Sequence, residues 1–280
     1  MHDSKKETSK MIDNFVDEYN SKDAIIRYSR RSAGYGINYL LQKDYADIYL
    51  RVIKSNGFPL RQSGLKLLEF GCGAGMNLIS LVRILKDQGI QTEKAYGTDF
   101  SPVLIESARS DAKEVLPPEA LARISFCVAR NEALIDDISK ASGEKVADLT
   151  ETFDLILGVN TFRYCHRLGK QRECANDIFK LLRKGGVCIM IDMNRGFPLF
   201  RSKLKRTIKD PLECYLPSLE EYASPFAQAG FQILEKDNFC WIPHSAGPML
   251  TRLGRMLSPL LNLTVRKFAM RSLVIAKKPL

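Results

Sequence analysis

The sequence has few of the residues that bind metals and none of the usual metal-ligand spacings. It contains three histidines and seven cysteines in 280 residues, and no C-x-x-C pair occurs. A structural zinc site needs such ligands clustered at short spacing, so no metal is expected. The odd number of cysteines, several of them in or beside apolar stretches, favours free thiols in a reducing, cytoplasmic compartment.

Long apolar runs are missing as well. No stretch reaches the roughly 20 apolar residues of a membrane-spanning helix, and the polar residues 1–7 lack the apolar core of a signal peptide. Lys and Arg number 42 against 32 Asp and Glu. This basic excess suits an anionic small molecule, RNA or an acidic membrane surface as partner, and it equally suits an ordinary basic surface.

What the sequence does have is a glycine-rich turn after a predicted buried strand at 65–70. Gly71, Gly73 and Gly75 remove every second Cβ, so the backbone can turn tightly and a ligand can approach its N–H groups. The helix predicted next would offer its N-terminus to an anionic group. The spacing is not that of a dinucleotide-binding loop, because Met76 stands where the third small residue is required.

Two acidic residues end the first two predicted strands. Glu69 precedes the glycines, and Asp99 ends a strand at 94–99, where a carboxylate can accept ribose hydroxyl groups. With Glu69 the motif reads E-x-G-x-G-x-G, and here the chain resembles the class I S-adenosylmethionine (SAM) dependent methyltransferases. The resemblance implies SAM as the cofactor and assigns the ribose contact to Asp99.

Further features of that family follow along the chain. A Phe-Asp pair opens a strand at 152–160, an L-x-x-G-G return precedes a strand at 187–192, and Ala-Gly-Phe precedes a sixth strand. We therefore expect an α/β fold: a Rossmann-like, seven-stranded, mostly parallel sheet with helices on both faces and an antiparallel final strand. Residues 1–60 would form a helical cap or lid, and 61–280 the SAM-binding domain. A basic insertion at about 243–267 contains prolines that argue against a long interfacial helix.

The cofactor-binding candidates lie at the carboxyl ends of the predicted strands. They are Glu69, Gly71, Cys72, Gly73, Gly75, Asp99, Phe100, Asn131, Glu132 and Asn160. The turn after a third predicted strand, at 123–129, departs from the family, because Arg130 stands where an aspartate commonly binds the adenine amino group. Asn131 or Glu132 would have to make that contact.

The acceptor site is predicted from aromatic and basic residues near the same edge. The substrate-binding candidates are Tyr28, Tyr35, Arg163, Arg167, Arg195 and Trp241. An acceptor hydroxyl must lose its proton, which calls for a base, and His166 and His244 are the candidates. The alternative for each of these residues is an ordinary structural place in the core, in a loop or on a solvated basic face.

The function predicted from these residues is O-methylation of a small metabolite, anionic or sugar-containing. A methyltransferase acting on a lipid or on RNA is an alternative, and so is a SAM-binding protein without turnover. DNA is not expected, because the turn at 158–162 carries no N/D-P-P-Y motif and no Pro-Cys pair. The sequence gives no indication of the oligomeric state.

Overall fold

The computed structural model describes residues 19–21, 45–55, 64–198, 216–242 and 247–280. Most of the predicted cap at 1–60 lies outside these ranges. The same holds for three predicted site residues, Tyr28, Tyr35 and His244.

Seven strands form one sheet in the order β3-β2-β1-β4-β5-β7-β6. They are β1 (Leu65–Phe70), β2 (Thr92–Asp99), β3 (Ile124–Val128), β4 (Phe153–Val159), β5 (Leu182–Met193), β6 (Gln232–Phe239) and β7 (Arg271–Lys277). Strand β7 runs antiparallel to both of its neighbours, and the pairs among β1 to β5 are parallel. The predicted sheet and its antiparallel final strand are confirmed. The strand order reverses between β1 and β4, where open α/β sheets bind their ligands.

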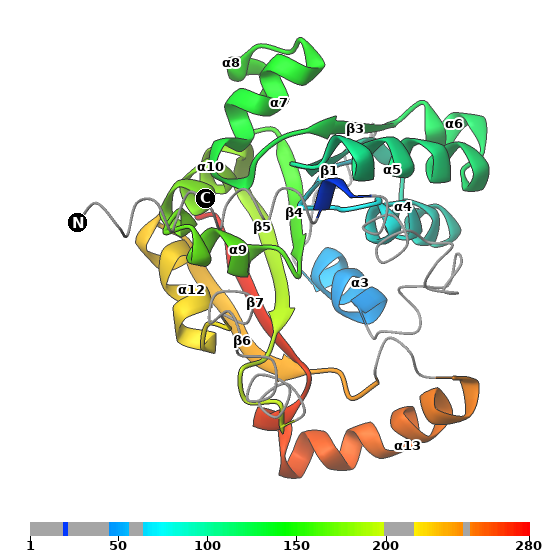
Figure 1. Cartoon of the computed structure of the whole chain (residues 1–280), viewed down its shortest axis with the longest axis vertical. Coiled ribbons are helices and arrows are strands. Elements are labelled where there is room, and N and C mark those ends of the chain that lie inside the picture. Colours follow the sequence, from blue (N-terminus) through cyan, green and yellow to red (C-terminus); the bar gives the residue numbers. More distant parts are fainter. Residues whose placement is uncertain (1–18, 22–44, 56–63, 199–215, 243–246) are drawn as a thin grey trace.

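Helices cover both faces of the sheet (Figure 1). On one face lie α3 (Tyr45–Ser55), α4 (Met76–Asp87) and α5 (Pro102–Val115); on the other lie α7 (Leu134–Ser142), α10 (Gln171–Leu181) and α12 (Leu219–Gln228). Alternate residues of β1 serve the two layers, since Leu65 and Leu67 pack with the first group and Leu68 and Phe70 with the second. Short turns of helix fill the connections: α6 (Pro118–Leu121), η2 (Asn131–Ala133), α8 (Val146–Leu149) and α9 (Phe162–Arg167).

A long helix, α13 (Pro248–Thr264), precedes η3 (Arg266–Phe268) and β7. The expectation that prolines would prevent a long helix here is wrong. Pro248 occupies the first turn, where its missing N–H is not needed, and Pro259 is accommodated within the helix. In Figure 1, α13 (orange) lies along one end of the molecule, apart from the helices that cover the sheet. Among the described residues, no helix has the length and apolar character needed to cross a membrane.

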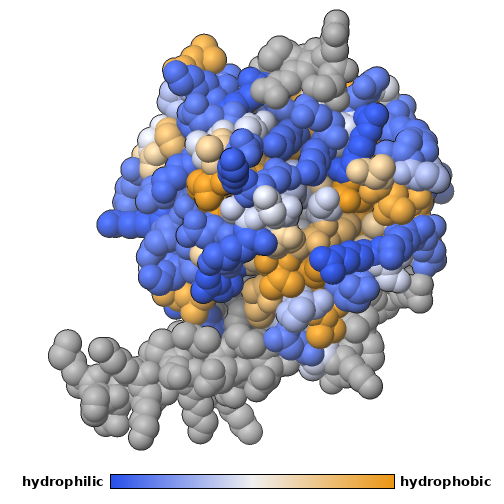
Figure 2. All heavy atoms as spheres, turned by 90° about the horizontal axis from the view of Figure 1, so that it is seen from above, coloured by the Kyte–Doolittle hydropathy of each residue, from blue (hydrophilic) through white to orange (hydrophobic). Residues whose placement is uncertain are grey.

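The surface seen from above in Figure 2 lies away from α13. It is mostly hydrophilic, with hydrophobic patches between the polar residues.

Candidate cofactor and acceptor site

The glycine turn is held in a conformation that favours glycine. Gly71, Gly73 and Gly75 have φ values of 61°, 55° and 74°. A Cβ on Gly71 would come within 1.9 Å of Thr161 Oγ1, so β1 and β4 can approach here only because the side chain is absent. A Cβ on Gly73 would meet nothing within 4 Å. The middle of the turn therefore borders open space, which a ligand could occupy.

Asp99 ties this turn to the end of β2. Its Oδ2 accepts a hydrogen bond from the Gly73 amide at 2.9 Å, and its Oδ1 accepts one from the Ser101 amide at 2.9 Å. Burial raises the pKa of Asp99 to about 6, although the hydrogen bonds from these two N–H groups act to lower it. Two carboxylate oxygens offer about four acceptor positions, so the group keeps capacity for a ligand hydroxyl.

Glu69 is a buried acid at the same edge of the sheet. It is 1% exposed, and burial raises its pKa to about 8. Its Oε1 accepts a hydrogen bond from Asn77 Nδ2 at 2.8 Å, and Asn77 in turn accepts one from the Tyr49 hydroxyl at 3.2 Å. Its Oε2 is buried and has no hydrogen-bond partner within the described part of the chain. A buried acceptor without a donor is costly unless a ligand or water satisfies it.

These observations fit the cofactor that the glycine motif implies. SAM carries an amino group that can donate to the unpaired Oε2 of Glu69 and ribose hydroxyls that can donate to Asp99. The open side of Gly73 leaves room for the chain that joins these two groups.

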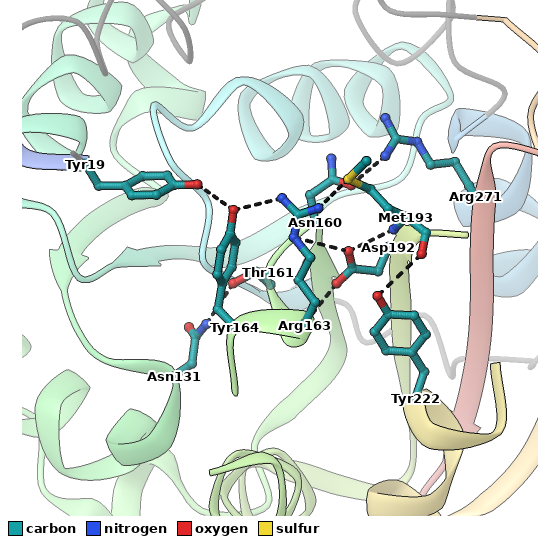
Figure 3. Close-up of polar contacts among 10 residues, drawn as sticks. All are labelled: Tyr19, Asn131, Asn160, Thr161, Arg163, Tyr164, Asp192, Met193, Tyr222 and Arg271. Atoms are coloured by element: carbon teal, nitrogen blue, oxygen red, sulfur yellow. Dashed lines mark hydrogen bonds and ion pairs between the residues drawn. The ribbon is translucent and has the colours of Figure 1, made fainter. Parts of the chain in front are cut away.

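At the end of β4, two predicted cofactor contacts are engaged with neighbouring side chains. Asn131 Nδ2 donates to Thr161 Oγ1 at 2.7 Å, and Asn160 Oδ1 accepts from Arg271 Nη1 at 2.7 Å. Asn160 has a φ of 56°, uncommon outside glycine, which marks the sharp turn after the strand. Figure 3 shows these two pairs together with the acceptor-side residues.

Tyr19, Arg163, Tyr164 and Asp192 form a connected group that we call the tyrosine–arginine cluster (Figure 3). The hydroxyls of Tyr19 and Tyr164 share a short hydrogen bond, and Arg163 Nη2 donates to Tyr164 at 2.8 Å. Asp192, fully buried at the end of β5, accepts from the Arg163 amide at 3.0 Å, and its Oδ1 lies 3.9 Å from Arg163 Nε. Burial lowers the pKa of Arg163, but Tyr164 and Asp192 help to raise it above its ordinary value, so this half-buried guanidinium stays charged.

Tyr19 links the cluster to the glycine turn. Its ring packs edge-on against Phe100 with centroids 5.6 Å apart, and its carbonyl accepts from Ser101 Oγ at 2.7 Å. Since Phe100 and Ser101 directly follow Asp99, the cluster and the expected ribose site are neighbours.

Two of the three other candidates contact residues outside the cluster. Arg195 is 66% exposed and lies 4.0 Å from a Glu221 oxygen, and Trp241 donates to Asn262 of α13 at 2.8 Å. Arg167 is partly buried at the end of α9.

His166 lies on the side of α9 that faces α12. Its ring packs against Phe162 and Tyr222, with centroid distances of 5.2 and 5.8 Å. Burial lowers its pKa to about 4, so the imidazole is neutral near pH 7.

The remaining cofactor candidates are Glu132 and Cys72, and Arg130 stands where the family commonly has an aspartate. Arg130 is turned toward α7, where Nε lies 2.9 Å from Asp137 Oδ2. Glu132 is partly buried in η2, and Cys72 is buried beside Asp99, with its thiol pKa raised by burial.

Four residues of the site were not among the candidates: Tyr19, Asn77, Tyr164 and Asp192. Asp192 could have been found, because it ends a predicted strand just as Glu69 and Asp99 do. Asn77 gave a weaker signal, an amide in the first turn after the glycines.

Comparison with known proteins agrees with this geometry. A sequence model of the methyltransferase domain family matches residues 61–246. A tRNA N(3)-cytidine methyltransferase of Danio rerio is 25% identical over 186 residues, 64% of this chain and 48% of the relative. A non-reducing polyketide synthase of Monascus ruber is 28% identical over 157 residues, 56% of this chain. The chain thus spans about half the length of the first relative and 5% of the second.

Among solved structures, magnesium protoporphyrin IX methyltransferase from Synechocystis PCC 6803 superposes with a TM-score of 0.58 at 15% identity. The match covers 95% of this chain and 99% of that one. Geranyl diphosphate C-methyltransferase from Streptomyces coelicolor A3(2) superposes with a TM-score of 0.52 at 12% identity. That match covers 84% of this chain and 79% of the other. At such identities these matches show a shared fold. Since the family model covers well over half of the sequence and the cofactor turn has the expected geometry, the chain belongs to the methyltransferase domain family, as a class I SAM-dependent methyltransferase.

Proposed function

We propose that the protein transfers the methyl group of SAM to an oxygen of a small, anionic acceptor bound at the tyrosine–arginine cluster. The observation that carries this proposal is the half-buried, charged Arg163 beside the expected ribose site. A guanidinium has five N–H donors, and two hydrogen bonds from Arg163 side-chain nitrogens are described, to Tyr164 and to the Met193 sulfur. The other donors suit a carboxylate or phosphate on the acceptor.

In this proposal the chain mainly binds and orients. When bound, SAM supplies an activated methyl carbon and leaves as a neutral thioether. Holding an acceptor oxygen in line with that carbon can supply about 7–11 kcal/mol of the rate acceleration. Glu69, the glycine turn and Asp99 would fix one partner, and Arg163 with the two tyrosine hydroxyls would fix the other.

We assign the base that removes the acceptor proton to one of two histidines, His166 or His244. His166 is neutral near pH 7 and can accept a proton, but a pKa of about 4 makes it a weak base. Its contacts with Phe162 and Tyr222 also point it toward α12. His244, outside the described residues, is therefore the candidate that we favour.

Matched variants test these assignments. We expect Tyr164→Phe and Arg163→Gln to lower transfer at least tenfold with SAM affinity unchanged, because both act on the acceptor. His244→Gln should lower the maximal rate, and His166→Gln should leave it within about twofold. Equal transfer by Tyr164→Phe and the unmodified protein would refute the acceptor site.

The acceptor class can be found with SAM labelled in its methyl group. The label should enter the anionic small-molecule fraction of a cell extract; a label in RNA or lipid would establish one of the alternatives. SAM binding without any labelled product would support the binding protein without turnover. NMR of a labelled product would show whether oxygen or carbon received the methyl group.

RNA is the second candidate function, supported by the net charge of +10 and by the tRNA methyltransferase relative. Binding to RNA through phosphate contacts predicts an affinity that falls steeply with salt. An affinity that does not change with salt would exclude this candidate.

A further inference from the structure

Helix α13 presents a row of large apolar side chains to the outside. None of its residues is buried. The exposed members are Met249, Leu250, Leu253, Met256, Leu257, Leu260 and Leu263, with exposed fractions from 39% to 85%. An apolar surface of this kind on a polar protein marks an interaction site.

The opposite side of α13 faces the body, and three of its four partly buried residues are small or polar; the fourth is Leu261. A Cβ on Gly254 would lie 2.9 Å from Ile242, and Asn262 accepts the hydrogen bond from Trp241. Thr251 and Ser258, on the same side, are partly buried. The helix is thus amphipathic in the reverse of the usual sense, since a helix that packs on a core turns its apolar side inward.

The charge around this helix has one sign. Residues 247–268 contain four basic residues and no acidic one. All four are exposed, and Arg266 also pairs with Asp237. Arg252 stands one turn before Met256, at the edge of the apolar row, where a long basic side chain can reach a polar headgroup while its stem stays in apolar surroundings.

We propose that α13 is an interfacial helix that docks the protein on a bilayer containing anionic lipids. The leucines and methionines would enter the boundary between headgroups and acyl chains, and Arg252, Arg255 and Lys267 would contact the headgroups. This proposal does not depend on the methyl acceptor.

Two other occupants fit the same surface less well. A second copy would bring two identical basic helices together, because a two-fold interface uses the same patch twice. RNA would gain little from leucine and methionine, and α13 contains no aromatic residue on which a base could stack.

The docked helix would be joined to the active edge of the sheet. Asn194, which follows β5, donates from its side chain to the carbonyls of Lys267 at 2.9 Å and Ala269 at 2.6 Å. Asp192 of the tyrosine–arginine cluster is two residues away. Docking would therefore hold this edge beside the bilayer.

Vesicle flotation with the full chain tests the proposal. We expect binding to phosphatidylcholine vesicles that contain about 30 mol% phosphatidylglycerol, and binding at least about tenfold weaker to pure phosphatidylcholine. Leu253→Gln/Met256→Gln/Leu260→Gln should lose binding about tenfold or more, and so should Arg252→Glu/Arg255→Glu. The matched control is Val146→Gln/Leu234→Gln, which alters two side chains that are 43% exposed elsewhere on the surface; it should bind as the unmodified protein does.

Three results would overturn the proposal. The first is flotation that is absent, or equal for the α13 variants and the control. The second is a dimer that becomes a monomer in the triple variant, which would assign the apolar row to a second copy. The third is a fall of several degrees in Tm for the triple variant alone, which would mean that the row is covered by the chain itself.

Discussion

The buried Glu69 makes a direct prediction about how stability depends on pH. Its pKa rises from 4.5 to about 8 on folding because burial penalises the charged form. Between these two pH values the unfolded chain loses the proton that the folded chain keeps. The contribution of Glu69 to the free energy of unfolding of the SAM-free protein should therefore fall as the pH rises, and it levels off above pH 8.

The substitution Glu69→Gln isolates this contribution. Glutamine has the same shape, and its Oε1 can still accept the hydrogen bond from Asn77. At about 1.4 kcal/mol for each pH unit, the difference in unfolding free energy between variant and unmodified protein should grow by about 4 kcal/mol from about pH 5 to about pH 8, in favour of the variant. Asp99 and His166 contribute equally to the unfolding free energies of both proteins, so their contributions cancel in this difference.

Urea unfolding at four pH values would measure the difference. Glu106→Gln is the control, because that carboxylate is 73% exposed and on the helix after β2. We expect its curve to run parallel to that of the unmodified protein. If the Glu69→Gln curve also runs parallel, the pKa of Glu69 is not raised on folding. Its carboxylate is then solvated in the SAM-free protein, and the argument that a ligand must satisfy its buried oxygen fails.

The other predictions concern the cofactor turn and the far end of the sheet. Gly73→Ala and Gly143→Ala both place a Cβ in open space at positive φ, so each should cost about 1–2 kcal/mol of stability, but only Gly73→Ala should weaken SAM binding in calorimetry. SAM binding near pH 6.5 should release a proton from Glu69, visible as a heat that depends on the buffer; no buffer dependence would contradict a cationic group beside it. Arg183→Leu leaves the buried Asp154 without its ion pair and should cost about 3–5 kcal/mol in urea unfolding with SAM affinity unchanged.

Local patterns were enough to place the predicted cofactor-binding residues at one edge of the sheet. Glu69, the three glycines and Asp99 lie within or directly after two strands, and parallel strands bring their carboxyl ends to one edge. The strand predicted at 94–99 ends where β2 ends, at Asp99.

The acceptor half depends on contacts that a local pattern does not contain. Tyr19 and Tyr164 share a hydrogen bond across 145 positions, and nothing near either residue indicates the other. Arg130 was recognised as a departure from the family, but its pairing with Asp137 on α7 required the structure. In α13 the apolar spacing was present in the sequence and the prolines were given too much weight, although one of them sits in the first turn.

The contacts of Tyr19 with Ser101 and Tyr164 suggest that acceptor binding and SAM binding use different parts of the chain. The sheet, the glycine turn and both acidic strand ends come after residue 64, while this tyrosine reaches back over them from the beginning of the chain. A shortened protein that starts at residue 45 should therefore still bind SAM but lack one side chain of the proposed acceptor site. The binding of SAM and the orientation of the acceptor could then be measured separately, by comparing the shortened and the full-length protein.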